Sequence, residues 1–360
     1  MVMPQIYGLF HRHFDGDEAL LRLARQRFEE LDIAAELYPN NVEHALAEWP
    51  LAPGDGILHF AHLPRHLDVL SSQHRDEISR FVSHLSGRAR GAVVHDHHSW
   101  LDRPSDVVAA LRKIDKSLVA TPQAPALFVE YAADLPLDWF VALAEDIREL
   151  GRVHICVDTG HMVLHGTKVQ FGRLRPGVDL WSLARDGERA RAWLVDLEHA
   201  IELGIRDLLS VIRRIVALGQ PVHFHLHDAH PLSLLSRYGV SDHLSFLQAI
   251  PVPSVVYRAG VVPGVLGPRG LSDILRPLTA ESVSQRVTLT LEIHPTNEDQ
   301  REPLGRHQDL FGHWTDLAHA ELSNAWFSTL AANTVLLRET WAKLQPREVG
   351  PTGPIAEPLR

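Results

Sequence analysis

The feature that most constrains the fold is the regular alternation of short apolar runs with longer stretches of helical periodicity. Branched aliphatic and aromatic residues are frequent in these runs, as is typical of strands. The runs cover residues 5–10, 33–38, 56–62, 91–97, 126–132, 153–161, 222–230 and 287–295. Amphipathic segments lie between them; residues 17–32, for example, place Leu20, Ala24 and Phe28 on one stripe. This alternation predicts a parallel α/β fold, and eight strands is the number that closes a (β/α)8 TIM barrel. An open doubly wound sheet is the alternative.

The 360 residues are enough for one large domain. We expect a single barrel domain over residues 1–343, with a helical or loop insertion at about 162–220, and a Pro/Gly-rich tail over 344–360. The connection after the sixth run predicts an extended loop with one extra short helix before a long helix. The connection after the seventh run contains GVVPGVLGPRG (260–270), which we expect to form an active-site loop.

Composition narrows the class of protein. The formal net charge of −10 disfavours nucleic acid as the default partner, because a phosphate backbone needs a basic surface. The only cysteine is Cys156, which excludes a disulfide framework. We found no targeting segment and no apolar stretch long enough to span a membrane. We expect a cytoplasmic protein that acts on a small molecule. Assembly into a homo-oligomer is compatible with the sequence.

Ionisable side chains stand at the ends of six of the eight runs, where apolar packing would otherwise be expected. Alternate residues of a strand share one face, and in a barrel the inward residues at the C-terminal strand ends converge on one site. The carboxylates are Glu130, Asp158 and Glu292. Converging carboxylates repel each other unless a positive charge lies among them, and a divalent cation with oxygen and nitrogen ligands provides that charge. The pattern therefore predicts a metal site.

Histidines from three further runs could supply nitrogen ligands. These inward candidates are His59, His95, His223, His225 and His227. The last three share one face of VHFHLHDAH (222–230), which leaves Val222, Phe224 and Leu226 to pack outward. We expect His225 to be the ligand, His223 to lie one layer deeper in the barrel, and His227 to orient substrate.

Each of these residues also has an ordinary structural explanation. Glu130 could be a salt-bridged strand end, and Asp158 could merely cap the next helix. His59 and His95 could be hydrogen-bonded polar residues, and the run that contains Glu292 could be a half-exposed antiparallel strand. Taken together, these explanations require the same coincidence at every strand end, so the metal site is favoured.

Four motifs in this order resemble the xylose isomerase-like TIM barrel superfamily, which includes sugar isomerases and epimerases, inosose dehydratases and endonuclease IV (AP endonuclease family 2). The motifs are FVEYA (128–132), VDTGH (157–161), HLHD (225–228) and TLEIHP (290–295). The resemblance covers about residues 5–340. It implies a shared divalent metal held by Glu130, Asp158, His225 and Glu292, with His59 and His95 as ligands of additional metals.

The endonuclease IV pattern includes two further elements after the sixth and seventh strands. His161 matches the histidine of its Asp-x-x-His turn. Its Asp-x-His pair would correspond to Asp242 and His243, but these two residues are adjacent in this chain. This difference implies either that a third metal site is missing or that another residue supplies its carboxylate.

Two classes of enzyme follow from the resemblance. The first is a sugar or polyol isomerase, epimerase or dehydratase, in which Glu130 and Glu292 transfer a proton, His161 and His227 orient hydroxyls, and Arg269 or Lys168 holds an anionic group. The loops at 162–190 and 256–272 would cover its site. One equivalent of Mn or Mg fits this chemistry.

The second class is a phosphoesterase with two or three ions of Zn or Fe, which the extra histidines favour. A non-catalytic barrel that only binds a ligand is a third alternative.

Overall fold

The computed structural model describes most of the barrel and leaves several connections undescribed. The described residues are 3–10, 17–54, 56–178, 180, 192–229, 243–247, 249–250, 262–263, 265–293 and 319–345. Asp242, His230 and the tail from residue 346 onward lie outside them.

Eight parallel strands close into a barrel, which confirms the (β/α)8 TIM-barrel fold. The barrel strands are β1 (Ile6–Phe10), β2 (Ala34–Leu37), β3 (His59–His62), β4 (Ala89–His95), β5 (Ala126–Glu130), β6 (Val153–Asp158), β7 (Val222–Leu226) and β10 (Val287–Leu291). Their order around the barrel is β1-β10-β7-β6-β5-β4-β3-β2, and β1 pairs with both β10 and β2. The pairing of β1 with β10 excludes the open sheet. A separate antiparallel pair is formed by β8 (Ala249–Ile250) and β9 (Val262–Pro263).

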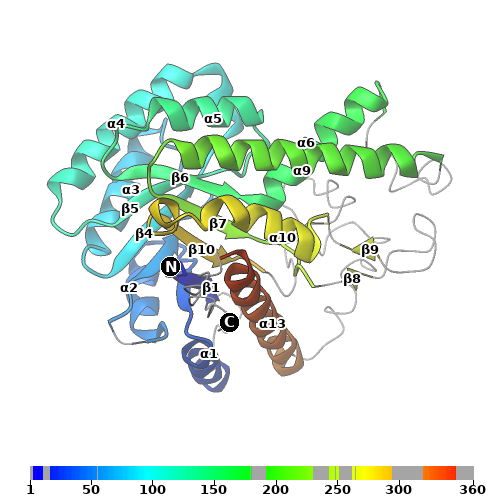
Figure 1. The fold of residues 1–360 in the computed structure, drawn as a ribbon. Helices are drawn as coiled ribbons and strands as arrows, with labels where there is room; N and C mark the ends of the chain where they lie inside the picture. The colour runs from blue at the N-terminus through cyan, green and yellow to red at the C-terminus, as the bar shows by residue number, and fades with distance from the viewer. Residues whose placement is uncertain are drawn as a thin grey trace, which may run out of the picture.

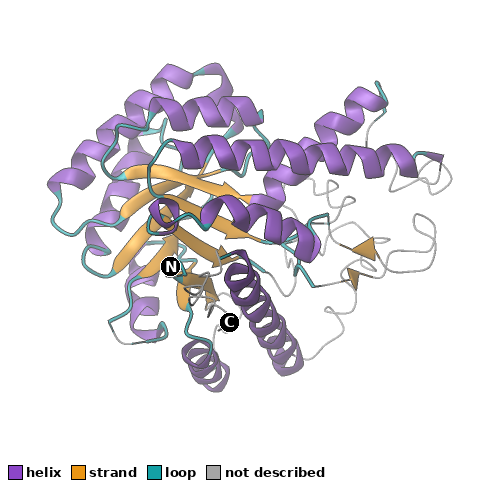
Figure 2. Ribbon diagram, viewed as in Figure 1, coloured by secondary structure: helices purple, strands orange, loops and turns teal. Residues whose placement is uncertain are grey.

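Helices surround the strands, whose arrowheads all point to the same end of the barrel (Figures 1 and 2). They are α1 (Glu18–Glu30), α2 (Val42–Glu48), α3 (Ser72–His84), α4 (Pro104–Ala120), α5 (Leu137–Asp146), α6 (Thr159–Leu174), α9 (Leu194–Ala217), α10 (Gly267–Leu275), α11 (Glu281–Ser284) and α13 (His319–Leu344). Short 3-10 helices are η1 (Trp49–Leu51), η2 (His98–Asp102) and η4 (Arg276–Leu278). Every helix of the described residues is too short or too polar to cross a membrane.

The strands sort their side chains into an outer and an inner core. Val222, Phe224 and Leu226 pack outward in the large core shared with the helices, as predicted. A smaller cluster fills the barrel interior and consists of Tyr7, Ala34, Phe60, Val93, Phe128 and Cys156. Most of these residues lie two positions before an ionisable residue of the same strand, so they form an apolar floor beneath the strand ends.

The connection after β6 differs from the expected extended loop. Helix α6 begins directly at Thr159, with Asp158 as its N-cap, and runs to Leu174. It lies beside the long helix α9 (Figure 1), whose buried residues Leu197, Ala200, Gly204, Leu208, Val211, Ile212 and Ile215 follow helical spacing. The stretch 162–174 is therefore a packed helix, because contact with α9 stabilises it.

The Gly/Pro-rich connection after β7 is also partly helical. Its end forms α10, with Pro268 in the first turn, where the fixed φ of proline suits a helix. The buried carboxylate of Asp228 accepts hydrogen bonds from the backbone N–H groups of Leu266 and Gly267, at 2.8 and 2.7 Å. The rest of the expected active-site loop, residues 256–261 and 264, lies outside the described residues.

Candidate metal centre

Four buried side chains converge at the C-terminal end of the barrel and form what we call the Glu130 cluster. Its members are His62, Glu130, His225 and Glu292, and one ligand atom from each lies within 4.8 Å of all the others. They come from β3, β5, β7 and the residue after β10. Parallel strands bring these residues together because their carboxyl ends meet at one end of the barrel.

Both glutamates of this cluster face the same imidazole nitrogen. Nδ1 of His225 lies 3.2 Å from Oε1 of Glu130 and 2.9 Å from Oε2 of Glu292. The second oxygen of Glu130 lies 2.8 Å from Nε2 of His62. His95, a predicted ligand, stands beside the cluster with its Nε2 3.1 Å from the same oxygen of Glu130.

The neighbouring charges of the Glu130 cluster shift the pKa values of Glu130 and His225. Burial opposes the ionisation of Glu130, but His95, His225 and His62 outweigh it and hold its pKa well below the usual range. Burial likewise opposes protonation of His225, yet Cys156 and the carboxylates of Glu36, Glu292 and Glu130 raise its pKa well above the usual value. Protonated His225 thus supplies a positive charge among carboxylates in the metal-free protein.

The prediction for the third strand was wrong by three residues. His59 begins β3 rather than ending it, and its Nδ1 accepts a hydrogen bond of 3.1 Å from the backbone N–H of Ala35. Because alternate residues share a face, Phe60 and His62 point inward while His59 points outward. His62 therefore takes the position that the sequence analysis gave to His59.

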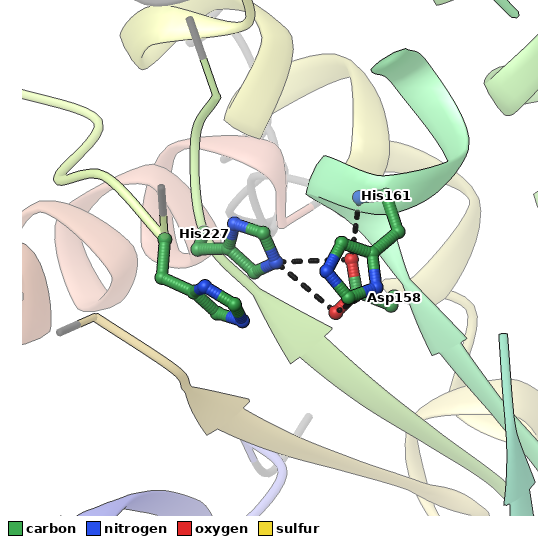
Figure 3. A group of neighbouring side chains, drawn as sticks. Asp158, His161 and His227 are labelled. Atoms are coloured by element: carbon green, nitrogen blue, oxygen red, sulfur yellow. Dashed lines mark hydrogen bonds and ion pairs between the residues drawn. The ribbon is translucent and has the colours of Figure 1, made fainter. Parts of the chain in front are cut away.

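A second group of four residues, which we call the Asp158 cluster, adjoins the first. It consists of Asp158, His161, His227 and His243, again with ligand atoms within 4.8 Å of one another. Nε2 of His227 lies 2.9 and 3.0 Å from the two oxygens of Asp158 (Figure 3). Burial opposes protonation of His227, but Asp158 outweighs it and raises the pKa of His227 to about 9.

The local sequence explains how the Asp158 cluster forms. Oδ1 of Asp158 accepts the backbone N–H of His161 at 2.6 Å, so the predicted helix cap and a ligand-type carboxylate are the same residue. The ring of His243 stacks on that of His227, with centroids 4.2 Å apart. His227 forms an ion pair with Asp158, and its role in orienting substrate stays a prediction.

The two clusters divide the ligand set that the resemblance implied. Glu130, His225 and Glu292 lie together, whereas Asp158 belongs to the neighbouring cluster. The clusters approach each other where Nε2 of His243 lies 3.6 Å from Oε2 of Glu292. The implied ligand set is therefore split between two adjacent groups, each of which could hold a cation.

Sequence reasoning missed two side chains of the site, Glu36 on β2 and Tyr38 directly after it. Glu36 is fully buried below the Glu130 cluster, and its Oε1 lies 3.0 Å from Nε2 of His225. The hydroxyl of Tyr38 donates a 2.7 Å hydrogen bond to Oε1 of Glu292, and its ring stacks on His62. A carboxylate in the otherwise apolar run IAAEL, followed two residues later by Tyr38 on the same face, is the signal that could have found them.

The remaining predicted residues belong to neither the Glu130 cluster nor the Asp158 cluster. Arg269 is exposed on the first turn of α10 and belongs to neither cluster. Lys168, on α6, pairs with the carboxylate of Asp134 at 2.5 Å. His223 lies one layer below His225, as predicted, with its ring stacked on Phe60 at a centroid distance of 4.0 Å.

The donor set fits a divalent cation. Among the described residues, the ion-pair partners of Glu36, Glu130 and Asp158 are all imidazoles, with no lysine or arginine. Mixed carboxylate and imidazole ligands suit Mn, Fe and Zn, and carboxylates suit Mg. His62, Glu130, His225 and Glu292 would hold one ion, and Asp158, His161, His227 and His243 could hold another.

Neither a protein-family model nor a curated protein sequence matches the chain. Among solved structures, it is similar to a thermostable mutant of the xylanase Xyn10A from Cellvibrio japonicus, with 12% identity over 86% of this chain and 91% of that chain and a TM-score of 0.46. It is also similar to the carboxyl transferase domain of Rhizobium etli pyruvate carboxylase, with 11% identity over 98% of this chain and 50% of that chain and a TM-score of 0.38. The strand pairing of this chain establishes the barrel. The two clusters are the basis for inferring its chemistry.

Proposed function

We propose that this chain is a divalent-metal-dependent enzyme of the xylose isomerase-like type that isomerises, epimerises or dehydrates a small sugar or polyol. The observation that carries the proposal is the convergence of Glu130 and Glu292 on Nδ1 of His225, at 3.2 and 2.9 Å. Two carboxylates at one buried point suit both metal binding and the removal and return of a proton.

The residues divide this work in the following way. A bound Mn, Mg, Zn or Fe ion would supply Lewis acidity toward two adjacent oxygens of the substrate. Glu130 and Glu292 would take and return the proton next to a carbonyl group. Tyr38 orients Glu292 through the hydrogen bond to Oε1, so that Oε2 faces His225. His161, largely buried at the start of α6, would contact substrate hydroxyls.

A multinuclear phosphoesterase of endonuclease IV type is the second candidate. The specific observation in its favour is the Asp158 cluster, which brings four more ligand-type side chains next to the first four. Two adjacent cations suit the cleavage of a phosphoester. The net charge of −10 makes a small phosphoester a better candidate substrate than DNA.

Solvent exchange separates the two candidates. Manganese-loaded protein is incubated in D2O with a panel of aldoses, ketoses and polyols, and the replacement of carbon-bound hydrogen by deuterium is followed by NMR. The proposal predicts exchange with at least one member of the panel, and a loss of roughly 100-fold or more in the Glu292→Gln protein.

The same preparations are assayed with nitrophenyl phosphate mono- and diesters. Ester cleavage without carbon-hydrogen exchange would replace the first candidate with the second. Metal binding with neither activity would favour a barrel that only binds a ligand.

A further inference from the structure

Glu36 is a buried carboxylate directly beneath the Glu130 cluster, and the proposed reaction leaves it without a role. Its side chain is wholly shielded from solvent. Oε1 lies 3.0 Å from Nε2 of His225, and Oε2 lies 3.3 Å from Nε2 of His223. The hydroxyl of Thr290 also donates a hydrogen bond to Oε2. An ionised carboxylate only accepts hydrogen bonds, so three donors in these positions suit it.

The surroundings hold Glu36 in one place. The ring of His223 stacks on Phe60, which belongs to the apolar floor of the barrel, and its Nδ1 lies 2.7 Å from the hydroxyl of Thr288. Glu36 is thus held from below by His223, which packs against the barrel interior. Among the described residues, His225 is the member of the Glu130 cluster that pairs with Glu36 from above.

The two nitrogens of His225 face carboxylates on opposite sides of the ring. Nε2 points down to Glu36, whereas Nδ1 points up to Glu130 and Glu292. A metal-binding imidazole offers one nitrogen to the ion and usually donates the other N–H to a carboxylate or carbonyl, which fixes the tautomer and the ring orientation. The partner of Nε2 therefore decides which nitrogen can bind a cation.

We propose that Glu36 is a positioning residue that holds the proton of His225 on Nε2 and so presents Nδ1 to a divalent cation at the Glu130 cluster. The inference rests on the metal site of the proposed function, and it assigns the ligand atom of His225 and the second-strand residue that selects it. Glu36 would touch neither the ion nor the substrate.

The direct test is the protonation pattern of the His225 ring. Full-length protein labelled with 15N-histidine is loaded with Zn²⁺, and long-range nitrogen–proton correlations are recorded; loss of one spin system in a His225→Asn protein assigns the ring. The inference predicts a proton on Nε2 and coordination through Nδ1. A proton on Nδ1 with coordination through Nε2 would overturn it.

Substitutions at position 36 give a graded second readout. Zinc affinity is measured by competition with a chromogenic chelator. Glu36→Gln keeps an acceptor oxygen but loses the charge, so we expect binding roughly 10-fold weaker, whereas Glu36→Met removes the acceptor and should weaken binding by about 100-fold. Thr290→Val removes one hydrogen bond to Glu36 and replaces Glu36→Met as a test if that variant does not fold. We expect it to weaken zinc binding less than Glu36→Gln does.

Asp115 provides the matched control. It is a buried carboxylate that accepts a 2.7 Å hydrogen bond from the backbone N–H of Arg152, directly before β6. This contact lies at the N-terminal end of the strands, whereas the Glu130 cluster lies at their C-terminal end. Asp115→Asn should leave zinc affinity unchanged. Wild-type affinity in Glu36→Gln, Glu36→Met and Thr290→Val alike would refute the inference.

A further pair of proteins separates this inference from the proposed function. If wild-type protein binds no zinc, or if Glu130→Gln binds it as tightly as wild type, the metal site itself is wrong. If Glu130→Gln abolishes binding while the His225 ring carries its proton on Nδ1, only the role of Glu36 is wrong.

Discussion

At the scale of single residues, Gly160 decides whether the Asp158 cluster can form. It lies in the turn between Asp158 and His161, and a Cβ atom at this position would overlap the ring of His227. A glycine is needed here because of a close approach, not because of an unusual backbone angle. The D-T-G-H motif therefore combines a helix cap, a carboxylate and the space for an imidazole from the next strand.

Gly160→Ala should displace His227 from Asp158. We expect the free energy of unfolding of the metal-free protein to fall by about 1–3 kcal/mol, the usual effect of overpacking a buried site. Urea unfolding followed by circular dichroism checks this. A Gly160→Ala protein as stable as wild type would mean that His227 does not occupy the position described.

The strand-end residues Glu130, Asp158, His225 and Glu292 could be predicted because alternation and strand ends are visible in the sequence. Glu36 could not be found in this way, because it lies inside its strand and acts from below. His62 was missed for a different reason. The run GILHFAH contains two histidines three residues apart, on opposite faces, and the choice between them depends on a register that periodicity alone does not determine.

At the scale of elements, two glycines set the contact between α6 and α9. A Cβ atom at Gly166 would lie 2.9 Å from Cα of Gly204, and one at Gly204 would lie 2.6 Å from the backbone nitrogen of Thr167. Backbone atoms cannot turn aside as a flexible side chain can. The close approach of these helices fixes α6, whose first turn carries His161.

Gly204→Ala should therefore destabilise the protein although alanine is the better helix former. We expect a loss of about 1–3 kcal/mol in the free energy of unfolding. Gly172→Ala is the matched control, because Gly172 lies in α6 with open space around it; this change should be neutral or stabilise the protein by up to about 1 kcal/mol. Thermal unfolding of both proteins provides the comparison, and equal effects of the two changes would contradict the packing argument.

Helix α6 also illustrates a limit of prediction from periodicity. Its glycines weaken the intrinsic preference for a helix, by about 1 kcal/mol each relative to alanine. Tertiary contact with α9 overrides that preference, and the cap at Asp158 fixes where the helix starts. The amphipathic pattern of α9, by contrast, is strong, and the helix was predicted from it.

At the scale of the whole molecule, the barrel carries an unusual number of buried imidazoles. Burial lowers the pKa of His59, His95 and His154 to about 4, so these side chains stay neutral in the folded protein until the pH falls to about 4. For His227, burial opposes protonation, but Asp158 outweighs it and raises the pKa to about 9. The lowered pKa values reduce stability as the pH falls, whereas the raised pKa of His227 reduces stability as the pH rises.

The buried histidines should make the stability of the metal-free protein depend on pH on both sides of about 6.5, the usual pKa of histidine. Below that pH, His59, His95 and His154 bind protons in the unfolded chain but stay neutral in the folded protein. The free energy of unfolding therefore falls as the pH drops from about 6.5 to 4, by on the order of 3 kcal/mol for each group. Above it, the stability from protonated His227 is lost as the pH rises toward 9. Urea unfolding across this range checks the curve. A His154→Phe protein should show a shallower acid limb, and an unchanged limb would contradict the assignment.

Closure of the barrel is the feature of the whole molecule that the sequence left open. Eight alternating runs are compatible with an open sheet, and only the pairing of β1 with β10 distinguishes the two. Closure also creates the site, because it brings Glu36 of β2 and the following Tyr38 to His225 and Glu292 from the second half of the chain.

The central claim is that the Glu130 and Asp158 clusters bind divalent metal. Elemental analysis of the purified full-length protein, with ions counted per chain, tests it most directly. We predict at least one tightly held equivalent of Mn, Mg, Zn or Fe, lost in a Glu130→Gln, Glu292→Gln double variant. A protein that contains none of these metals, and gains no stability or activity when each is supplied, would contradict the account.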